Sequence, residues 1–352
     1  MGKRLAVYVS SHGWGHAVRT AELLEHLFEL ADVDVHVRGE APKAAFPGSF
    51  LARVRSWRHL STDAGVVQSG EFLVDLEATR AKLATWDRVY PREVEKEAVW
   101  LAENADFVLG DVPPLAFDAA ATAGLPAVAL ANFSWDWIYA RLGLDQASQT
   151  AANAYAREVL LLELEPSCPM PAFTRRERLG LLGRRCRRAR DTIRDSLGIG
   201  EGERMVLIAI RDAQGSQCRL PPPMSGVVYM APEAAIAERR DDVLKADPHS
   251  PFIEFVAAAD AAVIKPGYGI LGDTAACGTP VIYSPRSGFP EDEVLVGALS
   301  RRSCSARVET DDLKSGQWGP LLLKVLAQTR PLPEKTTAAA KGAAILAKVM
   351  GE

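Results

Sequence analysis

The sequence lacks the features that mark a secreted, membrane-spanning or metal-binding protein. Its five cysteines are odd in number, scattered and without a C-x-x-C pair, which argues against a disulfide framework and a zinc site. No stretch reaches the ~18 apolar residues of a membrane span. The basic residues at the start precede an apolar run that is too short for a signal peptide, and no small-residue cleavage site follows. We therefore expect a cytoplasmic protein.

The sequence also lacks an excess of charge of either sign. Lys and Arg number 41 against 45 Asp and Glu, a net charge of −4, so no overall positive field would hold nucleic acid or an anionic membrane. We expect no nucleic-acid partner, and membrane association has no support from the overall charge. The 352 residues, 48% of them hydrophobic, suit two globular domains of about 150 residues each.

Strand-like and helix-like patterns alternate along both halves of the chain. "RLAVYVS" (4–10), the helical "HAVRTAELLEHLFELA" (16–31) and "DVDVHVRG" (32–39) open the first half, and "RMVLIAIRD" (204–212) restarts the alternation. This order predicts βαβ units with buried parallel sheets, in two Rossmann-like domains. Prolines near residue 170 break the pattern, so we expect domains at 1–170 and 171–334. An Ala-rich helix at 335–352 is expected to complete the first domain.

The stretch "SSHGWGHAVRTAELLEHL" (10–27) follows the first predicted strand. In a doubly wound domain this turn faces the ligand crevice, where its glycines allow close backbone approach and the helix N-terminus favours negative charge. His12 or His16 would then be a titratable group in the crevice. Tight packing of the turn is the alternative, and "GWG" falls short of the dinucleotide fingerprint G-x-G-x-x-G.

A second glycine-rich turn lies in "AAVIKPGYGILGDTAACGTPVIYSPRSGFPEDEVL" (261–295). Gly267 and Gly269 at a helix N-terminus suit a phosphate group. Asp273, about one turn further on, is placed to accept hydrogen bonds from the hydroxyls of a ribose. The alternative is a helix whose acidic residues only complement its dipole.

These strings resemble the GT-B glycosyltransferases. Residues 265–295 are similar to the nucleotide-sugar donor region of that class, including the peptidoglycan N-acetylglucosaminyltransferases. The opening stretch, "GDVPPLAFDAAATAGLPAVALANFSWDWIYA" (110–140), Arg175-Arg176 and "GYGILGDTAACGTP" (267–280) resemble, in the same order, the glycosyltransferase-like N-terminal region of L-arabinokinases. The resemblance implies an α/β GT-B fold with two Rossmann-like domains whose parallel sheets face each other across a cleft. It covers nearly the whole chain and leaves no room for a sugar-kinase half.

The resemblance also implies a set of donor-binding residues, namely Arg211, Gln214, Gly215, Gly267, Tyr268, Gly269, Asp273, Glu291, Asp292 and Glu293. The turn 267–269 would bind phosphate, Asp273 the ribose and 291–293 the sugar. Asp273 stands where glutamate is usual. Arg211 stands where a glycine is usual, which implies either an extra phosphate contact or a loop that no longer binds donor.

For catalysis, the resemblance to plant-type UDP-glycosyltransferases implies that His16 is the base and that Asp111 orients it, with His12 as the alternative base. An inverting transfer needs an acceptor hydroxyl to lose its proton as it attacks the anomeric carbon, and an imidazole with a pKa near 6.5 can take that proton. A carboxylate behind it fixes the tautomer. The alternatives are a packing histidine at a helix start and a turn-forming aspartate before two prolines.

Acceptor-binding candidates come from the same loop and from "NFSWDWIYA": they are His12, Trp14, Asn132, Trp135 and Asp136. The last three follow a predicted strand, where an aromatic face would stack on a sugar, and core packing of the tryptophans is the alternative. The arginine-rich segment 175–198 would bind anionic lipid or phosphate, or form a solvated face, which its charge pattern favours.

These residues predict an inverting, metal-independent glycosyltransferase, because no D-x-D motif lies near the donor loop. A nucleotide sugar, UDP-linked, would be the donor substrate and no cofactor would be needed. The acceptor would be a small molecule or a glycan. Two alternatives stay open, a noncatalytic nucleotide-sugar binding protein and a nonhydrolysing sugar-nucleotide epimerase.

Overall fold

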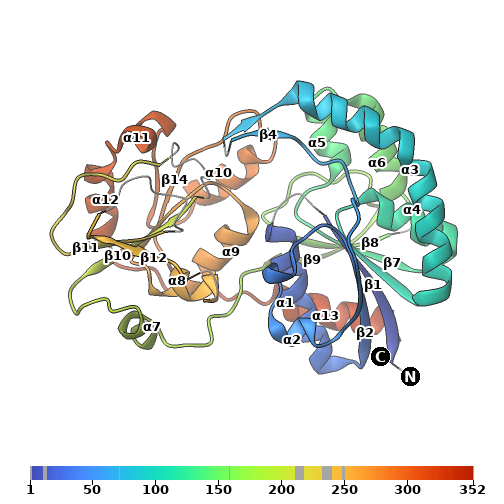
Figure 1. Ribbon diagram of the computed structural model, residues 1–352, viewed down its shortest axis with the longest axis horizontal. Helices are drawn as coiled ribbons and strands as arrows, with labels where there is room; N and C mark the ends of the chain where they lie inside the picture. The colour runs from blue at the N-terminus through green and yellow to red at the C-terminus, as the bar shows by residue number, and fades with distance from the viewer. Residues whose placement is uncertain are drawn as a thin grey trace. The chain divides into compact units, whose positions relative to one another are not determined.

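The chain divides into two compact units in a computed structural model, which describes residues 2–10, 14–70, 72–157, 159–210, 218–231, 240–247 and 250–351 (Figure 1). Unit 1 consists of Met1–Val67, Asp75–Leu182 and Thr337–Glu352, and unit 2 consists of Gln68–Val74 and Gly183–Thr336. Unit 1 runs past residue 170, where the sequence indicated its end. The reason is that Arg175–Leu181 pairs with the preceding strand as one more member of the unit 1 sheet.

Unit 1 is built on a seven-stranded sheet in the order β3-β2-β1-β6-β7-β8-β9, and all of its neighbouring strands pair in parallel. Its strands are β1 (Lys3–Val9), β2 (Val33–Arg38), β3 (Val54–Arg58), β6 (Phe107–Asp111), β7 (Ala127–Ala131), β8 (Leu160–Glu165) and β9 (Arg175–Leu181). The last five residues of β1 are fully buried, as expected of a central strand covered on both faces. The charged β9 lies at the edge, where burial is low.

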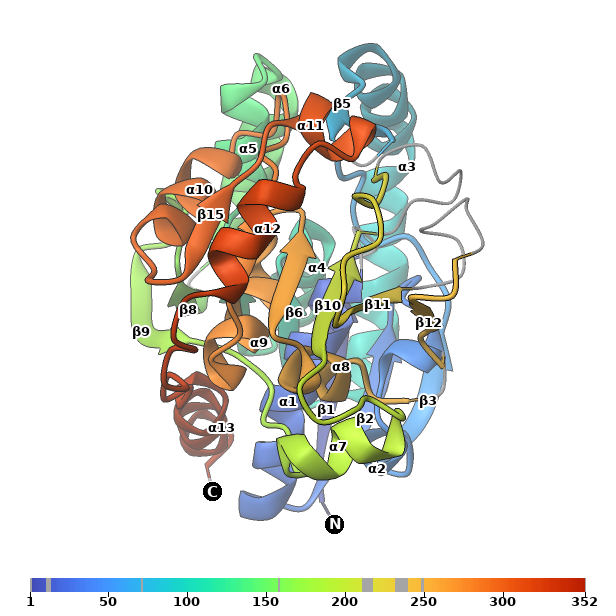
Figure 2. The ribbon, with the colours of Figure 1, turned by 90° about the vertical axis from the view of Figure 1, so that its left-hand side faces the viewer.

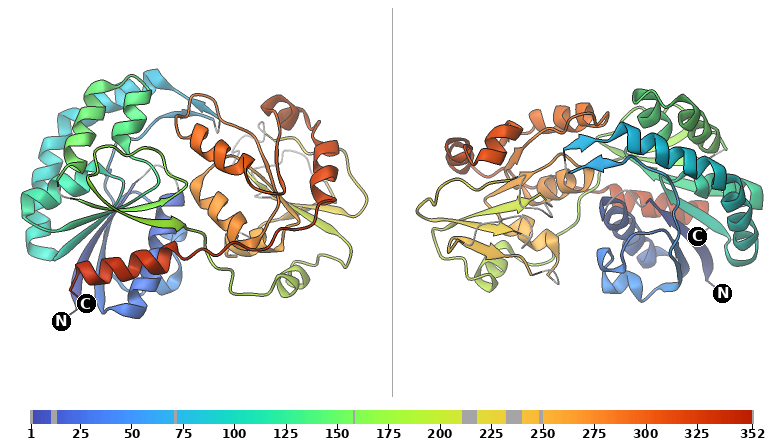
Figure 3. Two further views of the ribbon diagram at one scale, coloured as in Figure 1. Left: turned by 180° about the vertical axis from the view of Figure 1, so that it is seen from behind. Right: turned by 45° about the horizontal axis from the view of Figure 1, so that its top comes forward.

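The helices of unit 1 connect these strands, except α13 (Ala338–Val349), which follows the last helix of unit 2 in the chain. They are α1 (Trp14–Leu30), η1 (Lys43–Ala45), α2 (Gly48–Leu51), α3 (Leu76–Asn104), α4 (Pro114–Ala123), α5 (Trp135–Arg141), α6 (Asp145–Tyr155) and α13 (Ala338–Val349). Helix α13, red in Figure 3, packs against α1 and β9. Gly342 permits this approach, because a Cβ there would lie 2.8 Å from Leu23 and 2.9 Å from Leu179.

Unit 2 is built on a six-stranded parallel sheet in the order β12-β11-β10-β13-β14-β15 (Figure 2). Its strands are β10 (Arg204–Ala209), β11 (Val227–Ala231), β12 (Val243–Lys245), β13 (Ala261–Ile264), β14 (Val281–Tyr283) and β15 (Ser305–Arg307). Its helices are α7 (Arg190–Ser196), α8 (Phe252–Ala258), α9 (Tyr268–Cys277), α10 (Asp292–Ser300), α11 (Thr310–Ser315) and α12 (Gly319–Leu326).

A short hairpin from the first half of the chain belongs to unit 2. Its strands β4 (Gln68–Ser69) and β5 (Leu73–Val74) pair antiparallel. The backbone N–H of Ser287 donates to the carbonyl of Phe72 over 2.7 Å, and Phe72 joins the unit 2 core.

The predicted α/β class with two parallel sheets is confirmed. Among the helices that the structure describes, none combines the length and the apolar character needed to cross a bilayer.

Candidate active site

The candidate site of unit 1 lies where adjacent strands of its sheet end. Asp111 is the last residue of β6, Asn132 follows β7 and Pro166 follows β8. Because β1, β6, β7 and β8 are neighbouring parallel strands, their carboxyl ends meet at one edge of the sheet. Helix α1, which follows β1, supplies His16. In doubly wound sheets this edge is where ligands bind.

The structure brings the two predicted catalytic residues together. Nδ1 of His16 lies 2.8 Å from Oδ1 of Asp111, although 95 residues separate them in the chain. Both side chains are buried, His16 with 6% of its surface exposed and Asp111 with none. The ring of Phe133 meets the imidazole edge to face at 5.7 Å. This is the geometry that a carboxylate needs to orient an imidazole.

Two residues that sequence reasoning missed complete the surroundings of Asp111. Arg19 donates from Nε to Oδ2 over 2.8 Å and from Nη2 to Oδ1, and the hydroxyl of Thr20 donates to Oδ2 over 2.8 Å. Arg19 lies three positions after His16 and Thr20 four positions after it, so both lie on the same face of α1 as His16. This spacing was a signal in the sequence from which they could have been predicted. Burial alone would raise the pKa of Asp111, but the charge of Arg19 and then His16 hold it at about 2.

The backbone directly after Asp111 is strained. Val112 has a φ of 77°, a region that β-branched residues rarely adopt. Its carbonyl accepts a hydrogen bond of 2.7 Å from the buried hydroxyl of Tyr155. Strain of this kind persists only where surrounding contacts hold it, and it clusters at functional sites.

A separate candidate site lies in unit 2, at the start of α9. Gly267 is the N-cap residue, Tyr268 begins the helix, and Gly278 ends it in the left-handed conformation with φ of 62°. The helix N-terminus follows β13, so it lies at the carboxyl edge of the unit 2 sheet. Gly269 lies in the first turn of α9, so the turn 267–269 that the sequence assigned to phosphate binding is a helix N-terminus, the arrangement that favours anions.

Asp273 is buried in α9 and is engaged by Arg184. The backbone N–H of Arg184 donates to Oδ1 over 3.0 Å, and its guanidinium donates from Nε over 3.1 Å and from Nη2 over 2.5 Å to Oδ2. Gly183 makes this approach possible, since a Cβ there would lie 2.2 Å from the carbonyl oxygen of Gly272. The carboxylate of Asp273, to which the sequence assigned the ribose, therefore already binds Arg184, next to Gly183, where the chain passes from unit 1 to unit 2.

The acidic group after β14 is paired in the same way. Arg286 donates from Nε to Asp292 over 2.6 Å and from Nη2 to Glu291 over 2.7 Å, and its backbone N–H donates to Asp292 over 2.6 Å. Burial raises the pKa of Asp292 even though Arg286 opposes the shift. Glu293 lies in the first turn of α10.

Comparisons with known proteins agree on the architecture. No family model matches the chain. It is 32% identical over 335 residues to an L-arabinokinase of Arabidopsis thaliana, across 92% of this chain but 32% of that protein, so the chain spans about a third of its relative. Solved structures similar to it include UGT89C1 of Arabidopsis thaliana complexed with UDP, with a TM-score of 0.65, 13% identity and 99% of each chain covered. The glycosyltransferase SnogD of Streptomyces nogalater has a TM-score of 0.59 and 16% identity, covering 98% of this chain and all of its own.

The fold is that of the GT-B glycosyltransferases. Several residues that the resemblance assigned to binding lie outside the described residues: His12, Arg211, Gln214, Gly215 and the side chain of Trp14.

The three acceptor-binding candidates whose side chains the structure describes are buried. Trp135 is 1% exposed, stacks on Tyr139 with ring centroids 5.3 Å apart, and donates its indole N–H to Asp63 over 3.2 Å. Asp136 is also buried, and burial raises its pKa. Asn132 donates to the carbonyl of Pro166 over 2.9 Å. This packing favours the core interpretation for Trp135 over a stacking face for a sugar.

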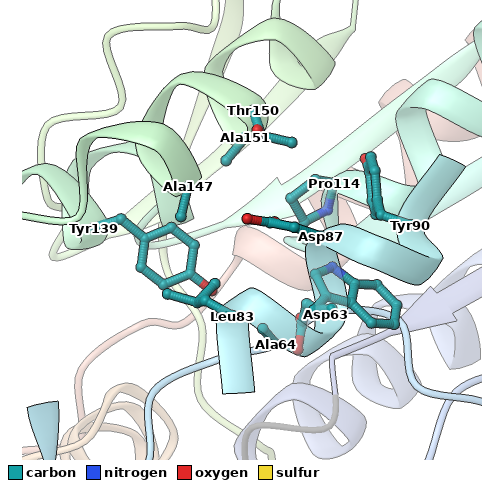
Figure 4. A pocket seen from close by; sticks show the side chains of 11 residues that line it. Asp63, Ala64, Leu83, Asp87, Tyr90, Pro114, Tyr139, Ala147, Thr150 and Ala151 are labelled. Atoms are coloured by element: carbon teal, nitrogen blue, oxygen red, sulfur yellow. The ribbon is translucent and has the colours of Figure 1, made fainter. Parts of the chain in front are cut away.

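Two pockets do not match a sugar site. One of about 20 Å³, formed by α3, α4, α5, α6 and the loop that carries Asp63, has room for about one water (Figure 4). Another of about 510 Å³ in unit 2 lies at the amino ends of the strands, beside Arg204 and Asp260. Ligands of doubly wound sheets bind at the opposite, carboxyl edge.

Several arginines of the arginine-rich segment 175–198 are paired within unit 2. Arg188 bonds to Glu254 over 2.7 Å, and Arg190 and Arg194 bond to Asp260 over 2.8 Å and 3.0 Å. These contacts favour a structural role over lipid binding. Within the described part of the chain, no group of three or more His, Cys, Asp or Glu side chains is placed to hold a metal ion.

Proposed function

We propose that this protein is an inverting glycosyltransferase that moves a sugar from a UDP-linked donor to a small-molecule or glycan acceptor. The observation that carries the proposal is the contact of 2.8 Å between His16 and Asp111, at the edge of the sheet where ligands bind. The GT-B fold supports it, because similar structures include UGT89C1 complexed with UDP and the glycosyltransferase VinC in complex with dTDP.

In the proposed reaction, His16 takes the proton of the acceptor hydroxyl as the oxygen attacks the anomeric carbon. A positioned base of this kind contributes about 10²- to 10⁴-fold to the rate. Asp111 stabilises the imidazolium that forms, since Arg19 and Thr20 hold its carboxylate ionised and in place. The bond between the anomeric carbon and the donor phosphate breaks, and the nucleoside diphosphate leaves with the negative charge.

We place the departing diphosphate at the N-terminus of α9. Its backbone N–H groups and helix dipole favour a phosphate without a metal ion. The resemblance assigns the ribose to Asp273, and that role requires Arg184 to release bonds that now occupy both carboxylate oxygens. The sugar role of Glu291 and Asp292 requires the same of Arg286.

The first experiment is a thermal-shift titration with UDP, dTDP and GDP in the presence of EDTA. A nucleotide at ~100 times its dissociation constant should stabilise the protein by about 2.7 kcal/mol. Incubation with the matching nucleotide sugars and a cell extract, followed by mass spectrometry, should then reveal a glycosylated product. If none of the three nucleotides shifts the melting temperature, the donor assignment is wrong, and activity that EDTA abolishes and Mg²⁺ restores would contradict the metal-independent site.

A noncatalytic nucleotide-sugar binding protein is the second candidate. The observation that favours it is the pairing of Asp273, Glu291 and Asp292 with arginines of the same chain, which occupies the carboxylates assigned to the donor. This candidate predicts a nucleotide-dependent thermal shift without turnover. An epimerase would instead release an isomerised nucleotide sugar without any acceptor, and the same mass-spectrometric assay detects that product.

A further inference from the structure

A hairpin from the first half of the chain is bound to the segment that follows β14. Leu73 of β5 forms a parallel bridge with Ser287, and the backbone N–H of Ser287 donates to the carbonyl of Phe72 over 2.7 Å. Gly288 lies against the next hairpin residue, because a Cβ added to it would be 3.6 Å from the Cβ of Val74. Three consecutive residues of the hairpin therefore contact two consecutive residues of this segment.

Both the core of unit 2 and the start of α3 hold the hairpin in place. Phe72 is 8% exposed and belongs to the hydrophobic core of unit 2. At the base, the N–H of Asp75 donates to the carbonyl of Val67, and the carboxylate of Asp75 accepts from the N–H of Ala78 in the first turn of α3, each over 2.9 Å. Strands of two residues are too short to hold a hairpin by themselves, so Phe72 is its main anchor.

Residues 286–292, called the acidic segment below, are also closed by a side chain of their own. The guanidinium of Arg286 binds Asp292 and Glu291, and it lies 4.1 Å from the centre of the ring of Phe289. The residues that contact the hairpin lie between the two ends of this closed loop. The acidic segment is therefore held at two points, by the ion pairs of Arg286 at its ends and by the hairpin in between.

A bound sugar would compete with the ion pairs and not with the hairpin. The sugar role of Glu291 and Asp292 requires Arg286 to give up its bonds to them. The hairpin contacts use the main chain of Ser287 and Gly288, so they can persist while the ion pairs open. Because ordering a free backbone costs conformational entropy, a segment that the hairpin keeps in place binds a sugar more tightly than one that it leaves free.

We propose that the hairpin 68–74 positions the acidic segment for the sugar of the donor, with Phe72 as the positioning residue. It keeps the segment in place while the bonds of Arg286 to Glu291 and Asp292 give way to those of the sugar. The nucleoside diphosphate is placed at the start of α9, outside the acidic segment, so the hairpin affects the affinity for the sugar and not that for the nucleotide. The role in sugar recognition rests on the proposed function, whereas the hold on the acidic segment does not.

The first test needs no ligand and follows hydrogen exchange of the acidic segment in the full chain by mass spectrometry. Phe72→Ala removes the anchor, so exchange in the acidic segment should rise about tenfold or more. Leu73→Ala is the matched control, because its side chain is 50% exposed and its bridge to Ser287 is made by the main chain. This control should leave the exchange unchanged.

Gly288→Ala is the second variant, since Phe72→Ala also removes a side chain from the core of unit 2 and can unfold it. Gly288 is exposed and has a φ of 77°, where alanine is strained, so the substitution disturbs the contact from the side of the acidic segment. It should raise exchange in the acidic segment and leave β10 and β13 protected. Unchanged exchange in Gly288→Ala and in folded Phe72→Ala would overturn the proposal.

The second test compares UDP with UDP-glucose and UDP-N-acetylglucosamine by calorimetry in EDTA. Phe72→Ala and Gly288→Ala should weaken the binding of a nucleotide sugar about tenfold and change the affinity for UDP by less than about twofold. Equal loss for UDP and its sugars, or no loss for either, would overturn the role in sugar recognition, and a wild-type protein that binds UDP alone would do the same. A wild-type protein that binds none of the three would overturn the proposed function and the sugar role with it, and the exchange data would still decide whether the hairpin holds the acidic segment.

Discussion

The low pKa of Asp111 makes its stabilising effect measurable. The pKa falls from 3.8 to about 2 in the folded state, and about 1.4 kcal/mol per unit gives about 2 kcal/mol. Because the folded-state pKa is depressed, this stabilisation is complete above about pH 5 and is lost as the pH falls through about 2. From these two values, about 1 kcal/mol should be lost by pH 3. Asp111→Asn does not titrate in this range and should lack that loss.

The measurement is hydrogen exchange of the α1 and β6 amides in a urea series at several pH values. It follows unit 1 alone and therefore does not depend on the two units unfolding together. The wild-type protein should be more stable than Asp111→Asn at neutral pH, and the difference should shrink by about 1 kcal/mol between pH 6 and pH 3. A difference that stays constant over this range would show that Arg19 and His16 do not stabilise the ionised carboxylate, and the reasoning on the site would fail.

Three further predictions concern both units. His16→Ala should lower the rate of sugar transfer by about 10²-fold or more without changing nucleotide affinity. The rate losses of His16→Ala and Asp111→Asn should not add in the double variant, because the two side chains act together on the same step. Arg184→Ala and Asp273→Ala should show a coupling energy of about 1–3 kcal/mol in a double-mutant cycle of unfolding, since they share a partly buried ion pair. Gly183→Ala should destabilise unit 2 by about 1–3 kcal/mol, because its Cβ would meet a backbone oxygen at 2.2 Å.

Matched controls separate these effects from general loss of folding. Gly297→Ala adds a Cβ in the helix α10 that meets only the side chain of Arg301 at 3.5 Å, and it should stabilise the helix by about 0.5–1 kcal/mol. Equal changes in the free energy of unfolding for Gly183→Ala and Gly297→Ala would contradict the close packing of Gly183 on α9. Additive losses for Arg184 and Asp273 would show that the ion pair is not formed. Normal turnover by His16→Ala would exclude it as the base.

The sequence by itself indicated the α/β class and the alternation of strands and helices in each half of the chain. Continuous apolar runs and the spacing of the helices are local signals, and they identified parallel strands such as β1 and β6. The turn after the first strand indicated His12 or His16 as a titratable group, and the resemblance to plant-type UDP-glycosyltransferases named His16 together with Asp111. Parallel strands bring their carboxyl ends to one edge, which explains why the turn after β1 and the end of β6 lie together.

Only the tertiary structure determines which arginines and carboxylates form ion pairs. Arg19 and Asp111 are 92 residues apart, and Arg184 and Asp273 are 89 residues apart, so no pattern along the chain relates them. The burial of Trp135 was equally hidden, because an aromatic residue after a strand suits a core as well as a ligand. Composition gives the number of charged residues, and periodicity indicates which side of a helix or strand is buried. Only the packing of distant segments determines which carboxylate an arginine contacts, and this pairing sets the electrostatics of the site.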